Sequence, residues 1–393
     1  MSGRCLIQRR LPSLTTPLSL LPTQSSWTSS REDRKGQTLT HVQLQPLSWR
    51  SFVSRTGQRM GRDGEEKVVV VTNTHTDMGT SRDDNTMESE MVGSGSTYDT
   101  LEPSVLVDNL LEYTESLMAT ADHHMVAYSG GIDSSLVLAL LLQVDKSNSV
   151  QAVLGLSPAV PQEQIDLARS VASHLQAPLV EVHTDEGSND VYIENAGQAC
   201  FACKTHLYSS LEAVLNHTQQ QHDQSSLSSS TPSTSSVSSH QLYNGTNADD
   251  TTDPTRVGLI AARNFSVLSP LEFTTKHNVR RAARYLGLPN WNVAASPCLR
   301  SRLALGVEAT RDHLERIERA ERLVRKDLAN VLDVTSNLRV RMLTNQRARV
   351  EVDGPVVQEA LEHQPEWDRI FVQELGFASV QVAAFKSGSV SKS

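Results

Sequence analysis

The pattern of apolar and polar positions predicts alternating strands and helices from about residue 104 onward. Some segments repeat apolar residues at helical spacing, and others are short apolar runs typical of buried parallel strands. The first of these elements fall, in chain order, at residues 104–118, 124–130, 134–144, 151–157, 161–175, 178–184 and 203–215. Alternation at such short spacing predicts an α/β fold, a doubly wound parallel sheet with helices on both faces.

A Gln- and Ser-rich stretch at residues 217–241 interrupts this alternation. It has no periodic apolar positions, so we expect a low-complexity, disordered insertion looped out of the sheet domain. The alternation resumes afterwards at residues 241–250, 258–265, 266–271 and 275–288. The predicted sheet domain thus spans residues 101–309.

From Thr310 onward the pattern changes to a charged amphipathic helix, two strands, a second helix and a final strand. This order resembles half of a ferredoxin-like sandwich. We therefore expect a small C-terminal α+β unit at residues 310–393.

Residues 1–100 are predicted to be a disordered leader, because their polar composition cannot bury a core. The first acidic residue is Glu32, and several arginines precede it among many serines, as in organelle transit peptides. A transit peptide would direct the protein to the mitochondrion or another organelle. A merely disordered tail, or a true start at Met60, would leave it cytoplasmic.

The composition excludes some classes of partner. The formal net charge of −9 argues against a general nucleic-acid binder, since such proteins carry a basic surplus. No run of about 18 apolar residues is present, so we expect no membrane partner. The four cysteines are too few for a disulfide scaffold in a chain of 393 residues.

The strongest motif is SGGIDSS at residues 129–135, between a predicted strand and a predicted helix. Its glycines allow a tight turn, and the helix directs its N–H groups and positive dipole end at the same point. An ordinary strand-to-helix turn is the alternative. The motif resembles the PP-loop of ATP pyrophosphatases, which implies ATP cleaved between the α and β phosphates. The predicted ATP-binding residues are Ser129, Gly130, Gly131, Asp133, Ser134 and Ser135, with Asp133 also holding Mg²⁺.

Three cysteines follow the predicted leader. Cys200 and Cys203 form a CxxC at the start of a helix, and Cys298 lies almost a hundred residues later. Their spacing is compatible with an iron–sulfur cluster held by three thiolates, or with zinc if His206 is the fourth ligand. Free or paired thiols are the third alternative.

Several motifs together resemble the LarE family of ATP-dependent sulfur transferases. They are AYSGGIDSSLVL (127–138), CFACKTHLY (200–208), NGTNADD (244–250), AARNFSVLSPL (261–271), TKHNVRRAARYLGLPNW (275–291) and PCLRSRLALG (297–306). The resemblance implies an enzyme that adenylates a carboxylate of pyridinium-3,5-biscarboxylic acid mononucleotide, releasing pyrophosphate and then AMP. Sulfur then forms a thiocarboxylate, a step in the synthesis of the nickel-pincer nucleotide.

The family has two sulfur sources, either a sacrificial cysteine or a sulfide carried on a [4Fe–4S] cluster. Cys200, Cys203 and Cys298 match the cluster type in number and place, which implies that these catalytic cysteines are also metal ligands. The donor would be sulfide or cysteine-derived sulfur. The resemblance also implies a homo-oligomer.

Further residues are candidates for binding the nucleotide or the substrate. Lys276, Arg280, Arg300 and Arg302 are expected near a phosphate or the substrate carboxylates, although the first two could equally decorate a solvated helix face. The loop with Thr246, Asn247 and Asp249 follows a predicted strand, at the edge where such sheets bind ligands. The alternative for this loop is a simple Asx turn.

The chain departs from the family pattern at three places. Asn264 and Asn292 stand where acidic residues are usual, and TRVG (255–258) replaces RPG. The two asparagines put the family's metal site in doubt, and TRVG is a further change near the active site. Two rival functions remain, an ammonia-dependent amidotransferase or synthetase similar to NAD or asparagine synthetase, and a non-catalytic nucleotide-binding protein, which the two asparagines favour.

Overall fold

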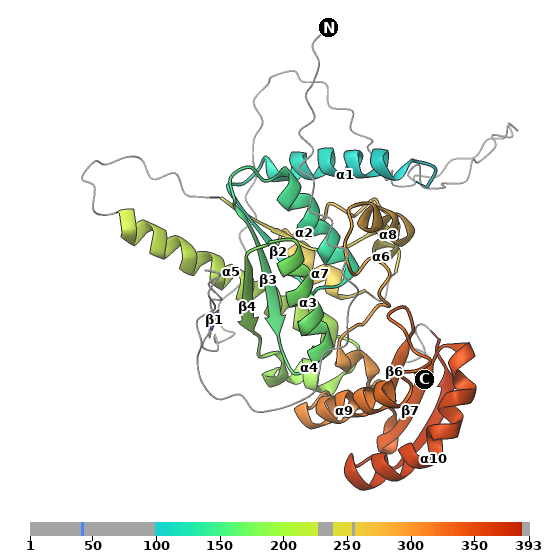
Figure 1. Ribbon diagram of the computed structural model, residues 1–393. Helices are drawn as coiled ribbons and strands as arrows, with labels where there is room; N and C mark the ends of the chain where they lie inside the picture. The colour runs from blue at the N-terminus through green and yellow to red at the C-terminus, as the bar shows by residue number, and fades with distance from the viewer. Residues whose placement is uncertain (1–40, 43–98, 227–238, 254–255, 387–393) are drawn as a thin grey trace, which may run out of the picture. The chain divides into compact units, whose positions relative to one another are not determined.

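A computed structural model describes residues 41–42, 99–226, 239–253 and 256–386 (Figure 1). They belong to one compact unit of the chain, residues 40–393. The predicted leader, and with it the transit peptide, lies outside the described residues except for residues 99–100 and the two-residue strand β1 (His41–Val42).

The main sheet has five parallel strands in the order β1-β4-β3-β2-β5. The longer strands are β2 (His123–Tyr128), β3 (Val150–Leu156), β4 (Leu179–His183) and β5 (His240–Tyr243). Val126 of β2 lies opposite Ala152 on β3 and Tyr243 on β5, so β2 is central. The chain winds outward from β2 to β3 and β4, and then returns to the other side of β2. This reversal creates a switch point at the carboxyl ends of β2 and β5, where such sheets bind ligands.

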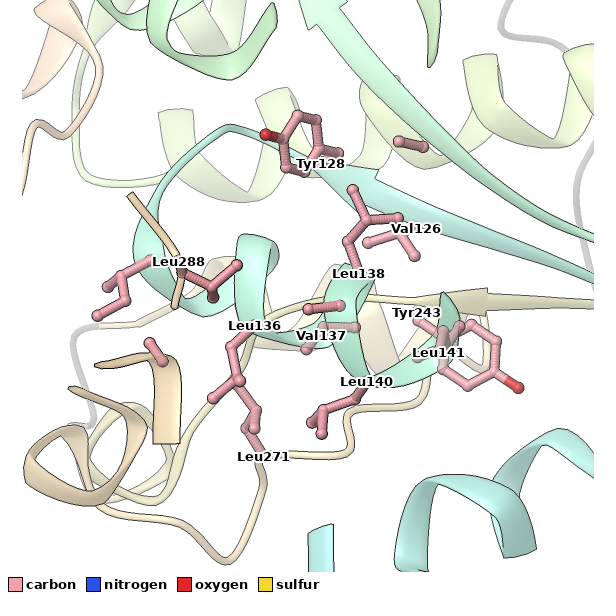
Figure 2. Close-up of a cluster of buried hydrophobic side chains, with 14 of the residues drawn as sticks. Val126, Tyr128, Leu136, Val137, Leu138, Leu140, Leu141, Tyr243, Leu271 and Leu288 are labelled. Carbon is pink, nitrogen blue, oxygen red and sulfur yellow. The ribbon is translucent and has the colours of Figure 1, made fainter. Parts of the chain in front are cut away.

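Helices cover both faces of this sheet. The buried cluster in Figure 2 joins one face to α1 (Pro103–Met118), α2 (Ile132–Val144), α3 (Gln162–His174) and α8 (Lys276–Tyr285). α2 is apolar on all sides because it packs against the sheet, α1 and α8 together. The opposite face packs on α5 (Ala199–Ser226), and α7 (Gly258–Asn264) lies against α5. The predicted doubly wound α/β fold is confirmed.

Successive side chains along each strand pack into the apolar cores on opposite faces of the main sheet. Val126 and Tyr128 belong to the cluster with α2, whereas Met125 packs with Val153 and with Leu211 of α5. Side chains of a strand point to alternate faces, so this division follows directly from the sequence.

The C-terminal unit has the element order that its sequence pattern predicts. Helix α9 (Arg311–Asp327) is followed by β6 (Leu338–Met342), β7 (Arg347–Val352), α10 (Val357–Glu374) and β8 (Ser379–Ala384). β6 and β7 are antiparallel, and β7 pairs directly with β8 in parallel. The unit is therefore a hairpin followed by a direct βαβ, unlike the split βαβ of a ferredoxin-like fold.

The remaining elements are short and connect the main ones. They are η1 (Glu186–Ser188), α4 (Asp190–Glu194), α6 (Ala248–Thr251), η2 (Leu299–Arg302), η3 (Thr344–Gln346) and η4 (Gly354–Val356). None of the described helices is both long and apolar enough to cross a membrane.

The prediction of a disordered insertion at residues 217–241 is wrong at both ends. α5 continues to Ser226, since residues 217–226 contain good helix formers such as Gln and no Gly or Pro, and β5 begins at His240. The middle, residues 227–238, lies outside the described residues. Residues 266–271 form no regular element and contribute only a parallel bridge from Leu268 to Tyr243.

Candidate functional site

The predicted phosphate loop, residues 129–135, joins β2 to α2 at the switch point of the sheet. Gly130 has φ +70°, and a Cβ there would lie 2.5 Å from the Cα of Ala168 on α3. Only glycine allows both the backbone conformation and this close packing. The two-glycine turn is thus required by the geometry of the loop.

Serine hydroxyl groups form hydrogen bonds within the phosphate loop. The Oγ of Ser134 accepts from the Ser129 N–H at 3.2 Å and donates to the Gly131 carbonyl at 3.1 Å. The Oγ atoms of Ser129 and Ser134 are 3.1 Å apart. No described side chain caps the first turn of α2, whose N-cap is Gly131. Its N–H groups and dipole therefore face a position where a phosphate would be stabilised.

A second loop, after β5, approaches the phosphate loop closely. A Cβ at Gly245 would be 2.7 Å from the Ser134 nitrogen, so the two backbones are nearly in contact. Asn247 is buried, caps α6 through Asp250, and donates from Nδ2 to Asp133 Oδ1 at 3.0 Å. The predicted residues of this loop are thereby brought to the phosphate loop.

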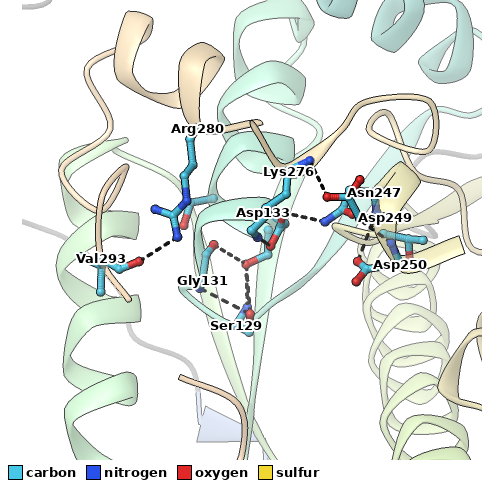
Figure 3. Close-up of polar contacts among 12 residues, drawn as sticks. Ser129, Gly131, Asp133, Asn247, Asp249, Asp250, Lys276, Arg280 and Val293 are labelled. Carbon is cyan, nitrogen blue, oxygen red and sulfur yellow. Dashed lines mark hydrogen bonds and ion pairs between the residues drawn. The ribbon is translucent and has the colours of Figure 1, made fainter. Parts of the chain in front are cut away.

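Lys276 completes this group from the first turn of α8. Its ammonium forms an ion pair with Asp133, and its backbone N–H donates to Asp249 Oδ2 at 3.1 Å. Figure 3 shows Asp133 between Asn247 and Lys276. Thr246 has a structural place in the same loop, where its carbonyl accepts from Ser269 at 2.6 Å.

Arg280 does not join this group. Its guanidinium donates to the carbonyls of Trp291, at 2.9 Å, and Val293, at 3.4 Å (Figure 3). The prediction that Arg280 gathers with Lys276 at a phosphate is therefore not matched by this structure, because carbonyl acceptors on the neighbouring loop hold the side chain.

Asn290 is a site residue that the sequence reasoning missed. It is 1% exposed, and its Nδ2 donates to the Gly130 carbonyl at 2.9 Å and to Ser135 Oγ at 3.0 Å. Ser135 is fully buried, so its hydroxyl supports the loop from within. The LPNW segment was the available signal, but its partners lie about 160 residues earlier in the chain.

The three cysteines form a second group. Cys200 and Cys203 lie in the first two turns of α5, and Cys298 directly precedes η2. Cys203 and Cys298 both pack against one buried cluster, and Cys298 and Cys200 both contribute to raising the pKa of Cys203. Arg300 donates from one nitrogen to Cys200 Sγ at 2.8 Å and from the other to Asn195 at 2.7 Å.

The two thiols of the CxxC differ in environment. Cys200 is exposed, whereas burial raises the pKa of Cys203 to about 12, and the carboxylate of Glu186 and the thiol of Cys298 add to this rise. A positive group or metal near Cys203 would oppose this effect, because it stabilises the thiolate.

Arg302 has a different role from the predicted one. Its side chain is 1% exposed and forms an ion pair with Glu321 of α9 at 2.9 Å. It also donates to the Pro297 and Cys298 carbonyls. The guanidinium is thus enclosed, and it fixes the segment that carries Cys298 instead of facing a ligand.

The donor set disfavours a single metal ion at the cysteines. Among the described residues, no group of three or more His, Cys, Asp or Glu side chains lies close enough to hold one. His206, the candidate fourth zinc ligand, accepts at Nε2 from the Asp185 N–H at 3.0 Å. Cys203 and Cys298 pack against the same buried cluster, and cysteine thiolates are the usual ligands of iron–sulfur clusters.

Both groups lie at the same edge of the sheet. The phosphate loop follows β2, and the cysteine group is anchored just beyond β3, where the Leu299 N–H donates to the Ala159 carbonyl at 2.7 Å. Carboxyl ends of parallel strands share one edge, so the two groups open towards the same side.

Comparison with known proteins assigns the chain to a family. No protein-family model matches it. It is 30% identical over 256 residues to the uncharacterized protein slr1717 of Synechocystis sp., covering 65% of this chain and 85% of that protein. It is also 30% identical over 268 residues to the pyridinium-3,5-bisthiocarboxylic acid mononucleotide synthase of Lactiplantibacillus plantarum, covering 67% of this chain and 87% of the synthase. The chain therefore belongs to the family of this synthase, the LarE family.

Proposed function

We propose that this protein is an ATP-dependent sulfurtransferase that acts on pyridinium-3,5-biscarboxylic acid mononucleotide. The observation that carries the proposal is the shared position of two groups, a phosphate loop and three cysteines, at one edge of the sheet. Supporting it, the synthase from Lactiplantibacillus plantarum is named for a bisthiocarboxylic product.

In the first step, a carboxylate oxygen of the substrate attacks the α-phosphorus of ATP and pyrophosphate leaves. The uncapped first turn of α2 and the loop hydroxyls bind the phosphates, and Lys276 offers a positive charge beside them. Asp133 would hold Mg²⁺, which usually binds through one or two carboxylates together with phosphate oxygens. For this, Asp133 exchanges its bond to Lys276 for the ion, and the ammonium moves to a phosphate.

In the second step, sulfur attacks the adenylated carbonyl carbon, the C–O bond to AMP breaks, and a thiocarboxylate forms. Cys200, Cys203 and Cys298 would hold a [4Fe–4S] cluster, which supplies an open iron for an added sulfide. Arg300 is positioned to stabilise negative charge at this sulfur-handling group, since it already donates to Cys200. Arg302 keeps the Cys298 segment in place.

The test is iron and acid-labile sulfide content of the full chain purified without oxygen, together with pyrophosphate release on adding the substrate. We expect about four irons per chain with matching sulfide, and loss of both in Cys298→Ala. Cys5→Ala is the matched control, because Cys5 is the one cysteine outside the proposed set. Absence of iron after anaerobic reconstitution would overturn the cluster proposal.

The same assays separate the rival functions. An ammonia-dependent amidotransferase would release pyrophosphate while holding no iron, and Cys298→Ala would change neither result, because this function needs no thiols. A non-catalytic nucleotide-binding protein would bind ATP and release no pyrophosphate with the substrate. Either result would contradict the proposed sulfur transfer.

A further inference from the structure

A cavity of about 190 Å³ lies beside the cysteine group, and the proposed function uses none of its lining residues. Its walls come from the loop after β3 (Pro158, Ala159), the loop after β4 (residues 184–188) and the start of α9. It therefore opens at the carboxyl ends of the strands, where ligands bind in this kind of sheet.

Two polar groups of buried residues line this cavity. Glu186 is 4% exposed, and its carboxylate is not among the enclosed, unpartnered polar atoms of the described residues. Tyr192 is 2% exposed, and its hydroxyl has no partner in the described part of the chain. A buried hydroxyl without a partner is costly, so the Tyr192 hydroxyl, beside a carboxylate that lines the same cavity, indicates a ligand that satisfies it.

The charges around the cavity define the chemistry of that ligand. Asp185 and Glu186 contribute two carboxylates, and Arg311 contributes one guanidinium. Glu186 is enclosed, whereas the Arg311 side chain is 74% exposed and therefore lies at the rim. A complementary ligand carries a positive group at its inner end and a negative group at its outer end.

A metal ion does not fit this description. The described residues contain no group of three or more carboxylate, imidazole or thiol side chains that could hold one. The size of the cavity suits a small organic molecule, because an engineered cavity of about 150 Å³ is known to hold benzene. An α-amino acid with a short side chain has about the same number of non-hydrogen atoms.

The cavity lies next to the cysteine group, because residues that line it contact the segment with Cys298. Ala159 lines the cavity, and its carbonyl accepts from Leu299, the residue after Cys298. Burial raises the pKa of Tyr192, and the nearby thiol of Cys298 adds to the rise. A molecule in the cavity therefore lies next to the cysteines.

We propose that this cavity binds a small zwitterionic α-amino acid, with its ammonium on Glu186 and its carboxylate at Arg311, and that the occupant is free L-cysteine. The choice of cysteine rests on the proposed function, since its thiol would lie beside the residues that handle sulfur. At the inner end, the hydroxyl oxygen of Tyr192 accepts a hydrogen bond from the same ammonium.

The test is calorimetric titration of the full chain, iron-free and reduced, without ATP. L-cysteine is expected to bind saturably. Cysteamine, which lacks the carboxylate, binds more weakly, and 3-mercaptopropionate, which lacks the ammonium, binds weakest because it brings an anion to Glu186. Glu186→Gln is expected to weaken L-cysteine binding at least about tenfold, as loss of a charged hydrogen bond does. Glu362→Gln, an exposed carboxylate on α10, is the matched control.

Absence of saturable binding, or equal binding of all three thiols, would overturn the proposal and leave water as the content of the cavity. L-alanine binding as tightly as L-cysteine would overturn the choice of occupant. The three-thiol comparison uses the unaltered chain, so it holds even if Glu186→Gln fails to fold. Binding is measured without ATP or substrate, so its failure is distinct from a failure of pyrophosphate release.

Discussion

At the residue scale, Gly130 has a backbone conformation and a neighbour that exclude any side chain. We expect Gly130→Ala to prevent stable folding or binding of ATP, because the added Cβ meets the Ala168 backbone at 2.5 Å. Gly287→Ala is the matched control: its φ is +72°, yet nothing lies within 4 Å of the added Cβ. The control should cost only about 1–2 kcal/mol, the penalty for left-handed backbone. Chemical denaturation measures the free energy of unfolding of both variants. Equal losses of this free energy in the two variants would contradict the packing argument.

Asn290 is buried and holds the phosphate loop in position through two hydrogen bonds. Asn290→Ala removes its bonds to the Gly130 carbonyl and to Ser135, of which Ser135 keeps a hydrogen bond with Tyr128. We expect a loss of about 1–3 kcal/mol in the free energy of unfolding, with weaker ATP binding. Gln373→Ala, on the exposed side of α10, should change neither. If ATP binding stays normal in Asn290→Ala, the loop does not depend on this support.

The two thiols of the CxxC should respond differently to pH in the iron-free protein. The pKa of Cys203 is raised to about 12, chiefly by burial, so its thiol stays protonated through neutral pH. Its alkylation by iodoacetamide should accelerate as pH rises towards that value, while the exposed Cys200 reacts first. Mass mapping of the alkylated peptides measures this order. The raised pKa contributes stability that is full below the pKa of the unfolded thiol, about 9, and is lost as the pH rises from there to about 12.

Sequence reasoning located those site residues whose partners are local. The phosphate loop is predictable because its glycines, hydroxyls and helix start are consecutive. Asn290 and Glu186 are not, because their positions are determined by packing of distant segments. Arg302 was assigned to a ligand because its partner, Glu321, is 19 residues away and nothing local indicates the pair.

At the element scale, one buried ion pair connects η2 to α9. Glu321 accepts from Arg302 and also from the Val340 N–H at 3.0 Å, so it joins the Cys298 segment, α9 and β6. Glu321→Gln leaves the enclosed guanidinium without a counter-charge. We expect a loss of about 3–5 kcal/mol in the free energy of unfolding, as for other broken buried pairs.

The exposed pair between Arg316 and Asp312 on the same helix provides the comparison. Its aspartate is 65% exposed, so Asp312→Asn should cost no more than about 0.5 kcal/mol. Denaturant unfolding monitored by circular dichroism measures both. Similar small losses in the two variants would show that the Arg302 guanidinium reaches water.

Most helices and strands were predictable because burial of one face imposes a regular spacing of apolar residues along the sequence. The apolar run of α2 and the alternating faces of β2 and β3 show this directly. Strand order was beyond prediction, since pairing of β7 with β8 depends on where α10 packs. The extension of α5 to Ser226 was missed because this part of the helix has no regularly spaced apolar residues, and only its helix propensity favours it.

At the scale of the whole molecule, one core joins the two predicted domains. Ala199, Ala202 and Leu299, before the predicted boundary at residue 309, share a buried cluster with Ile317 and Trp367, beyond it. The boundary itself remains a prediction. The cluster implies that the C-terminal unit and the cysteine-bearing segments stabilise one another, since each covers apolar surface of the other.

We therefore expect the chain truncated after residue 309 to lose the environment of its cysteines although it keeps the core around β2 and α2. In the full chain with Trp27, Trp49 and Trp291 replaced by Phe, fluorescence of Trp367, which is fully buried, should change in the same denaturant transition as circular dichroism of the sheet domain. In the truncated chain, Cys203 should be alkylated at neutral pH as readily as Cys200, because removal of the shared cluster exposes its thiol. Two separate transitions in the full chain, or a protected Cys203 in the truncated one, would show that the units fold independently, and the cysteine group would then belong to the sheet domain alone.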